Sequence, residues 1–108
     1  MFGKKKISWE EIVLSYKNNP RDVKTVPLKG DGIWFYVYVE NDNIYVENAK
    51  NHLDSYKIKN RRRLEQEKLD AMHSLYDRRN KGEAIYQDAK IITYNQVYWY
   101  GIFADMSI

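Results

Sequence analysis

The sequence contains no cysteine. This absence excludes a disulfide scaffold, a thiolate zinc site and a cysteine nucleophile, and it fits a reducing compartment, so we expect a cytoplasmic protein. No apolar run approaches the roughly 20 residues that a bilayer-spanning helix needs, and we therefore expect no membrane contact. The first residues, MFGKKKISWEE, have a basic start but no apolar run after it, so we expect no signal peptide.

Histidine is also scarce, which bears on the enzyme hypotheses. His52 and His73 lie far apart, and neither has a second histidine three or four positions away, as a metal-binding helix would need. A nuclease that places an Asp before one strand and Glu-x-Lys on the next is not matched, because the spacing from Glu47 to Lys50 is one residue too long. We therefore expect no enzyme activity, no metal, no cofactor and no small-molecule substrate.

The length and composition indicate one globular domain, residues 1–108. Of the 108 residues, 44% are hydrophobic and 31% are charged, which is typical of a folded chain with a single core. Residues 1–56 are expected to form a helix and a β-hairpin, and residues 57–108 a basic, helical part. The predicted fold class is therefore α+β.

The stretch ISWEEIVLSYKNNP predicts the N-terminal helix. Ser8 and Glu11 have the spacing of a capping box, and Ile7 and Ile12 that of a hydrophobic staple. The helix is expected to stop before Pro20. Its predicted apolar face comprises Trp9, Ile12, Val13 and Tyr16.

The stretch GIWFYVYVENDNIYVENA predicts a central antiparallel hairpin with a short Asn/Asp-rich turn. Residues 24–26 and 56–59 could add short strands. In the first hairpin strand, alternate residues face opposite ways, and the aliphatic face is the expected core. The other face carries Trp34, Tyr36 and Tyr38.

Basic charge is concentrated between Lys57 and Gly82, which hold nine Lys and Arg residues against four acids. This unevenness points to a polyanion more than the overall charge of +3 does, although a helix that is merely solvated by its charges would look the same. From Arg61 onward the residue types favour a helix that stops at Gly82. Its predicted apolar stripe comprises Leu64, Leu69, Met72, Leu75 and Tyr76.

The segment ITYNQVYWYGIF, residues 92–103, has the composition of a strand. Its flanks favour a helix from about Tyr94, because Thr93 and Gln96 have capping-box spacing and Ile92 and Val97 have staple spacing. A short helix is expected before it, over residues 84–92. We therefore expect a helix over residues 94–104, with a strand as the alternative.

A short helix, a tight turn and a last helix resemble helix-turn-helix DNA-binding domains. Ala89 fits the small residue of the first helix, whereas Thr93 stands where the turn usually has Gly. The resemblance implies an inner face formed by Tyr94, Trp99 and Ile102. It also implies outward-pointing readout residues near the start of the last helix, which are Asn95, Gln96 and Tyr98.

Nucleic acid, and DNA in particular, is thus the expected partner of a small regulator of bacterial or mobile-element type. The expected phosphate contacts are Arg61, Arg62, Arg63, Arg78, Arg79 and Lys81. The alternative is a non-enzymatic interaction or inhibitor module whose aromatic hairpin contacts a partner or a second copy of the chain. In that case Trp34, Tyr36 and Tyr38 form the contact surface.

Overall fold

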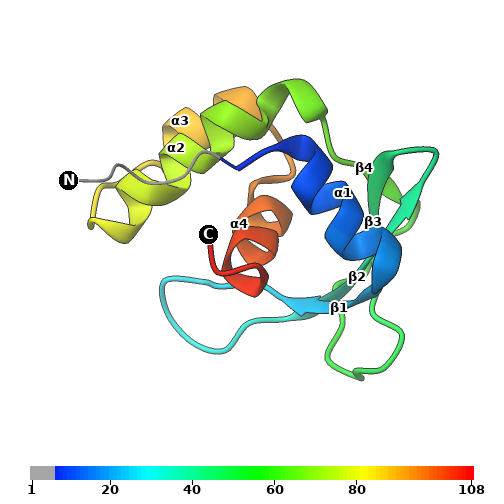
Figure 1. The fold of residues 1–108 in the computed structure, drawn as a ribbon. Helices are drawn as coiled ribbons and strands as arrows, with labels where there is room; N and C mark the ends of the chain where they lie inside the picture. Colours follow the sequence, from blue (N-terminus) through cyan, green and yellow to red (C-terminus); the bar gives the residue numbers. More distant parts are fainter. Residues whose placement is uncertain (1–6) are drawn as a thin grey trace.

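The computed structural model describes residues 7–108. Figure 1 shows the helices and the antiparallel sheet, and the expected α+β class, with its N-terminal helix, hairpin and C-terminal helices, is confirmed. The elements in chain order are α1 (Trp9–Asn18), β1 (Arg21–Lys24), β2 (Trp34–Glu40), β3 (Asn43–Asn48), β4 (Arg62–Arg63), the 3-10 helix η1 (Gln66–Lys68), α2 (Leu69–Asn80), α3 (Tyr86–Ile92) and α4 (Gln96–Asp105).

The N-terminal helix begins as the sequence predicts. The Ser8 side chain accepts a hydrogen bond from the Glu11 backbone N–H at 3.2 Å, which satisfies one of the free donors of the first turn. The whole predicted apolar face of α1 is buried, and α1 packs against β2. No helix among residues 7–108 has the length and the hydrophobicity to cross a bilayer.

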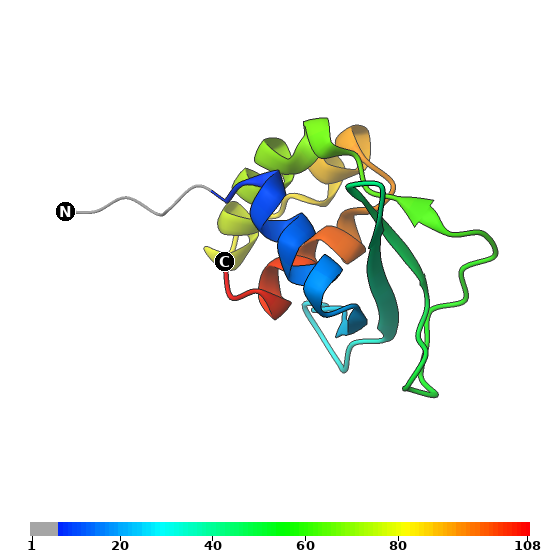
Figure 2. The same ribbon diagram turned by 45° about the vertical axis from the view of Figure 1, so that its right-hand side comes forward.

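The sheet has four antiparallel strands in the order β1-β2-β3-β4. The central hairpin turns through Asn41 and Asp42, whose φ angles of 53° and 62° suit these two residue types. This two-residue turn fixes the register, so that Tyr38 lies opposite Tyr45. Phe35 is fully buried on the core face of β2. The helices lie on one side of the sheet, and Figure 2 shows the other side without a helix over it.

The basic helix is shorter than the sequence predicts. Arg62–Arg63 forms the edge strand β4 rather than a helical turn, and the α-helix starts only at Leu69. The cause is tertiary: the Leu64 N–H donates to the Ile44 carbonyl, and the Leu64 side chain is fully buried. This pairing outweighs the helix propensity of the residues. The predicted end of the helix at Gly82, which has a φ of 90°, is confirmed.

The segment with the composition of a strand is the helix α4. All six residues from Tyr98 to Phe103 are buried, and a helix that is hydrophobic on every side belongs in a core. Gly101 lets α4 approach the sheet closely, because a Cβ there would lie 3.0 Å from the Phe35 ring and 3.1 Å from the Lys24 carbonyl oxygen. The unusual composition of this helix therefore reflects its central position.

The predicted capping of α4 is wrong. The helix begins at Gln96, after Asn95, and no side chain caps it. The Thr93 hydroxyl instead accepts from the Asn95 N–H at 3.0 Å and donates to a Glu65 carboxylate oxygen at 3.1 Å. The hydroxyl therefore stabilises the turn before the helix rather than the helix end. Tyr94, expected on the inner face, is 86% exposed.

Candidate nucleic-acid interface

A row of aromatic side chains covers the helix-free face of the sheet, which we call the open face. Trp34, Tyr36 and Tyr38 alternate along β2 with buried residues, and Tyr45 follows the same alternation on β3. The Tyr38 ring lies 5.7 Å from the Tyr36 ring and 5.7 Å from the Tyr45 ring, centroid to centroid, at interplanar angles of 28° and 25°. All four residues are half-buried.

Three cations lie over these rings. The Lys50 ammonium is 4.8 Å from the Tyr36 centroid, and the Lys24 ammonium is 5.8 Å from the Trp34 centroid. The Arg61 guanidinium lies 3.9 Å from the Tyr45 centroid, the shortest of the three separations. The open face therefore combines aromatic surface with positive charge. In nucleic-acid-binding proteins, aromatic rings stack with bases and cations attract phosphates.

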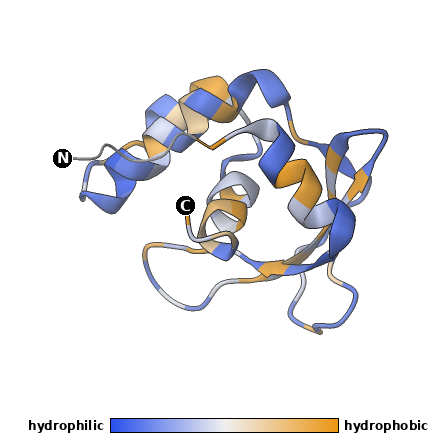
Figure 3. Ribbon diagram, viewed as in Figure 1, coloured by the Kyte–Doolittle hydropathy of each residue, from blue (hydrophilic) through white to orange (hydrophobic). Residues whose placement is uncertain are grey.

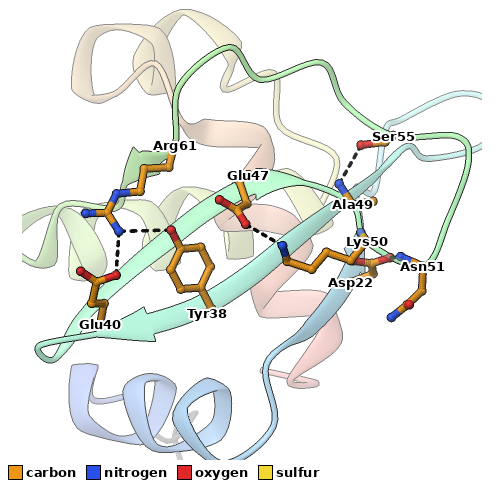
Figure 4. A network of polar contacts seen from close by, with 9 residues as sticks. All are labelled: Asp22, Tyr38, Glu40, Glu47, Ala49, Lys50, Asn51, Ser55 and Arg61. Atoms are coloured by element: carbon orange, nitrogen blue, oxygen red, sulfur yellow. Dashed lines mark hydrogen bonds and ion pairs between the residues drawn. The ribbon is translucent and has the colours of Figure 1, made fainter.

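Arg61 is also tied to the open face by polar contacts, which Figure 4 shows. One guanidinium nitrogen donates to the Tyr38 hydroxyl at 3.2 Å and to a Glu40 carboxylate oxygen at 2.8 Å. These two hydrogen bonds raise the pKa of Arg61 above its usual value. The ion pair is exposed on both sides, so it contributes little to stability and can exchange partners.

The loop after β3 is pinned to the sheet by Asp22. Its carboxylate accepts hydrogen bonds from the Lys50 and Asn51 backbone N–H groups, at 2.9 and 2.7 Å, and one oxygen lies 2.8 Å from the His52 Nδ1. Burial by itself would raise the pKa of Asp22, but these hydrogen bonds outweigh it and the pKa lies below its usual value. We call these contacts of Asp22 the clamp. Beside it, the His52 ring stacks on Trp34, with centroids 3.5 Å apart and planes 7° apart.

A basic edge segment, residues 57–63, borders the open face. It carries five Lys and Arg residues and no acid. Ile58, which is buried, anchors it, and the Ile58 N–H donates to the Asn48 side-chain oxygen. Arg63 lies opposite Tyr45 in the register and shares the open face, whereas Arg62 lies opposite Val46 and reaches the Asn95 side-chain oxygen at 3.3 Å.

The predicted readout residues do not point outward together. Tyr98 is 4% exposed and packs edge-on against Phe35, so the expectation that it faces solvent is wrong. Burial also raises the pKa of its hydroxyl. Asn95 is buried as well, and its amide donates to Glu65 at 2.8 Å. Gln96 is partly exposed.

The other three predicted phosphate contacts, Arg78, Arg79 and Lys81, lie at the far end of α2. Arg78 pairs with Glu83 at 3.2 Å and Asp88 at 3.4 Å, while the Arg79 guanidinium donates to the Val26 carbonyl. Lys81 follows the helix and is exposed. Figure 1 shows this end of α2 on the opposite side of the molecule from β4, and Figure 3 colours it as hydrophilic. The six predicted phosphate contacts therefore fall on two separate surfaces.

Four residues of the open face are missing from the sequence-based candidates: Lys24, Tyr45, Lys50 and His52. The two-residue turn gave a usable signal for Tyr45, because it places this residue opposite Tyr38. The other three depend on contacts across the sheet, which no local pattern indicates. Within the part of the chain that the structure describes, no group of three or more His, Asp or Glu side chains could hold a metal ion.

Comparisons of the chain with family models, with curated proteins and with solved structures found no match.

Proposed function

We propose that this protein binds single-stranded nucleic acid on the open face of its sheet. The observation that carries the proposal is the row of Trp34, Tyr36, Tyr38 and Tyr45, with cations over three of the four rings. Stacking of a base on an aromatic side chain contributes about 1–3 kcal/mol and tolerates any sequence. Such stacking needs bases whose faces are free, as they are in single strands.

The basic edge segment supplies the matching phosphate surface. Lys57, Lys59 and Arg63 have no ion-pair partner among residues 7–108, so their charge is not neutralised within the described chain. A strand with its bases on the tyrosines would run its phosphates along this edge. Because each neutralised phosphate releases counterions, the affinity should fall steeply with salt.

The last helix is not used for readout in this proposal. A recognition helix must expose one side to the major groove, whereas α4 is buried from Tyr98 to Phe103. The proposal keeps the expected partner class, nucleic acid, and moves the contact from α4 to the sheet. The resemblance to helix-turn-helix domains stays a prediction.

A protein partner on the same face is the second candidate. Three carboxylates, those of Asp22, Glu40 and Glu47, accompany the aromatic row, and they would oppose a polyanion. Each of them is engaged by a neighbouring cation or by backbone N–H groups, which weakens this objection. Binding that tolerates salt would identify the protein-partner alternative.

The test is fluorescence anisotropy with a labelled mixed-sequence single strand, titrated at several salt concentrations. We expect Tyr36→Ala to lower the affinity about fivefold or more and Tyr36→Phe to retain it, because phenylalanine keeps the stacking surface. Lys59→Glu should weaken binding and flatten the salt dependence. Tyr86→Ala on α3 and Lys17→Glu on α1 are matched controls, since both residues are exposed and belong to elements away from the open face.

Two results would contradict the proposal. One is the absence of binding to any single strand at low salt. The other is binding that Tyr86→Ala and Lys17→Glu reduce as much as the open-face variants do.

A further inference from the structure

A second basic surface adjoins the basic edge segment on the other side of β4. It is a cleft of about 410 Å³ between β4, η1 and the turn that joins α3 to α4. Four cations line it, Arg62, Arg63, Lys68 and Lys90, with one carboxylate, that of Glu65.

The one carboxylate of the cleft is fully engaged within the protein. Glu65 pairs with Lys68 at 2.9 Å and accepts hydrogen bonds from the Asn95 amide at 2.8 Å and the Thr93 hydroxyl at 3.1 Å. Burial would raise the pKa of Glu65, but these contacts outweigh it and lower the pKa below its usual value. Glu65 therefore neutralises Lys68 and leaves the other three cations of the cleft without a counter-charge.

Those three cations are free to bind an anion. Arg63, Lys90 and Arg62 have no ion-pair partner among residues 7–108, and the Arg62 guanidinium donates to the neutral side-chain amide of Asn95. Two large apolar side chains stand beside them, Ile91 and Tyr94, each 86% exposed. The open face also has cations beside aromatic rings, but there Lys50 and Arg61 are paired with carboxylates.

The strand β4 joins the two surfaces. Its residues alternate, so that Arg63 shares the open face with Tyr45, while Arg62 lies on the opposite side and reaches Asn95 in the cleft. A polyanion that leaves the open face toward the cleft would cross the basic edge segment, which contains no acidic residue.

We propose that the cleft binds phosphate groups of a single strand that continues beyond the open face. Arg62, Arg63 and Lys90 contact the phosphates, and the exposed ring of Tyr94 stacks with a base next to them. This inference rests on the proposed function and extends it, because it makes the binding site longer than the sheet and gives the α3–α4 turn a role.

The test compares a short and a long homopolymeric single strand, of about 4 and about 12 nucleotides, within the range of site sizes of single-strand-binding domains. The variants are Lys90→Gln and Tyr94→Ala, with Lys17→Gln and Tyr86→Ala as matched controls on exposed positions outside the cleft. Since Lys90 and Tyr94 are exposed, the variants should fold, which thermal unfolding would verify.

We expect the wild-type protein to bind the long strand more tightly than the short one. Lys90→Gln and Tyr94→Ala should each lower the affinity for the long strand several-fold and leave the affinity for the short strand unchanged. If the wild type binds both lengths and the cleft variants behave like the controls, the cleft is not part of the site, and the function proposed for the open face stands. If neither length binds, the proposed function fails and this inference fails with it.

Discussion

The replacement Asp22→Asn removes one negative charge from the clamp that holds the loop against the open face. The carboxylate has two oxygens that together meet two backbone N–H groups and the His52 ring, and its side chain is 2% exposed. Asparagine has only one oxygen. If that oxygen keeps the contacts with Asn51 and His52, the new NH₂ group faces the Lys50 N–H, and a donor meets a donor.

The expected cost follows from this mismatch. A hydrogen bond to a charged group contributes about 1.5–3 kcal/mol. The Lys50 N–H lies at an exposed position, so water replaces part of the lost contact. We therefore expect Asp22→Asn to lower the free energy of unfolding by about 1–2 kcal/mol. Urea unfolding at neutral pH, followed by far-UV circular dichroism, measures this difference.

The pH dependence of the free energy of unfolding tests whether the Asp22 carboxylate stabilises the fold as described. The pKa of Asp22 lies below its usual value in the folded protein. Its contribution is therefore complete above the unfolded pKa of about 3.9 and is lost as the pH falls through the lower, folded value. The gap between wild type and Asp22→Asn should be constant above about pH 5 and narrow in acid. A gap below about 0.5 kcal/mol at neutral pH, or one that does not change in acid, would show that the clamp contributes no stability of this kind.

Two further replacements test the open face and the core beneath it. Glu40→Gln frees the Arg61 guanidinium, which lies over the Tyr45 ring, from its exposed ion pair. We expect the affinity for a single strand to rise several-fold, while the free energy of unfolding changes by less than about 1 kcal/mol. An unchanged or weaker affinity in anisotropy titrations would argue against a phosphate contact by Arg61. Gly101→Ala places a methyl group 3.0 Å from the Phe35 ring. Overpacking of this kind costs about 1–3 kcal/mol, whereas alanine gains about 1 kcal/mol over glycine inside a helix, so we expect a net loss of stability of up to about 2 kcal/mol. A stabilising effect in urea unfolding would show that α4 and the sheet are less closely packed than we describe.

Local capping rules succeeded at one helix and failed at another, and the difference is physical. Among residues 7–108 the Ser8 hydroxyl has no competing partner, and it accepts a hydrogen bond from the Glu11 N–H, so α1 begins where the pattern predicts. The Thr93 hydroxyl is drawn into contacts with Asn95 and Glu65, a residue 28 positions away. A pattern of four residues cannot indicate a partner that only the folded chain brings near.

The residues of the candidate site could likewise be predicted only in part from the sequence. The alternation along β2 was enough to place Trp34, Tyr36 and Tyr38 on one face, because a strand has a period of two. The position of Arg61 over that face could not be predicted, since its residue type favours a helix and only the pairing of β4 with β3 makes an edge strand. The two faces of β2 thus follow from a local pattern, whereas the edge strand β4 and the neighbours of each ring depend on tertiary contacts.

The most direct test of the open face as a binding surface is a chemical-shift map. Backbone amide signals of the ¹⁵N-labelled protein would be recorded while a single-stranded oligonucleotide is added at low salt. We expect the largest shifts at residues 34–40, 43–48 and 57–63, and a return toward the free positions as salt is raised. Shifts confined to the end of α2 near Arg78, Arg79 and Lys81, with the sheet unchanged, would contradict the account.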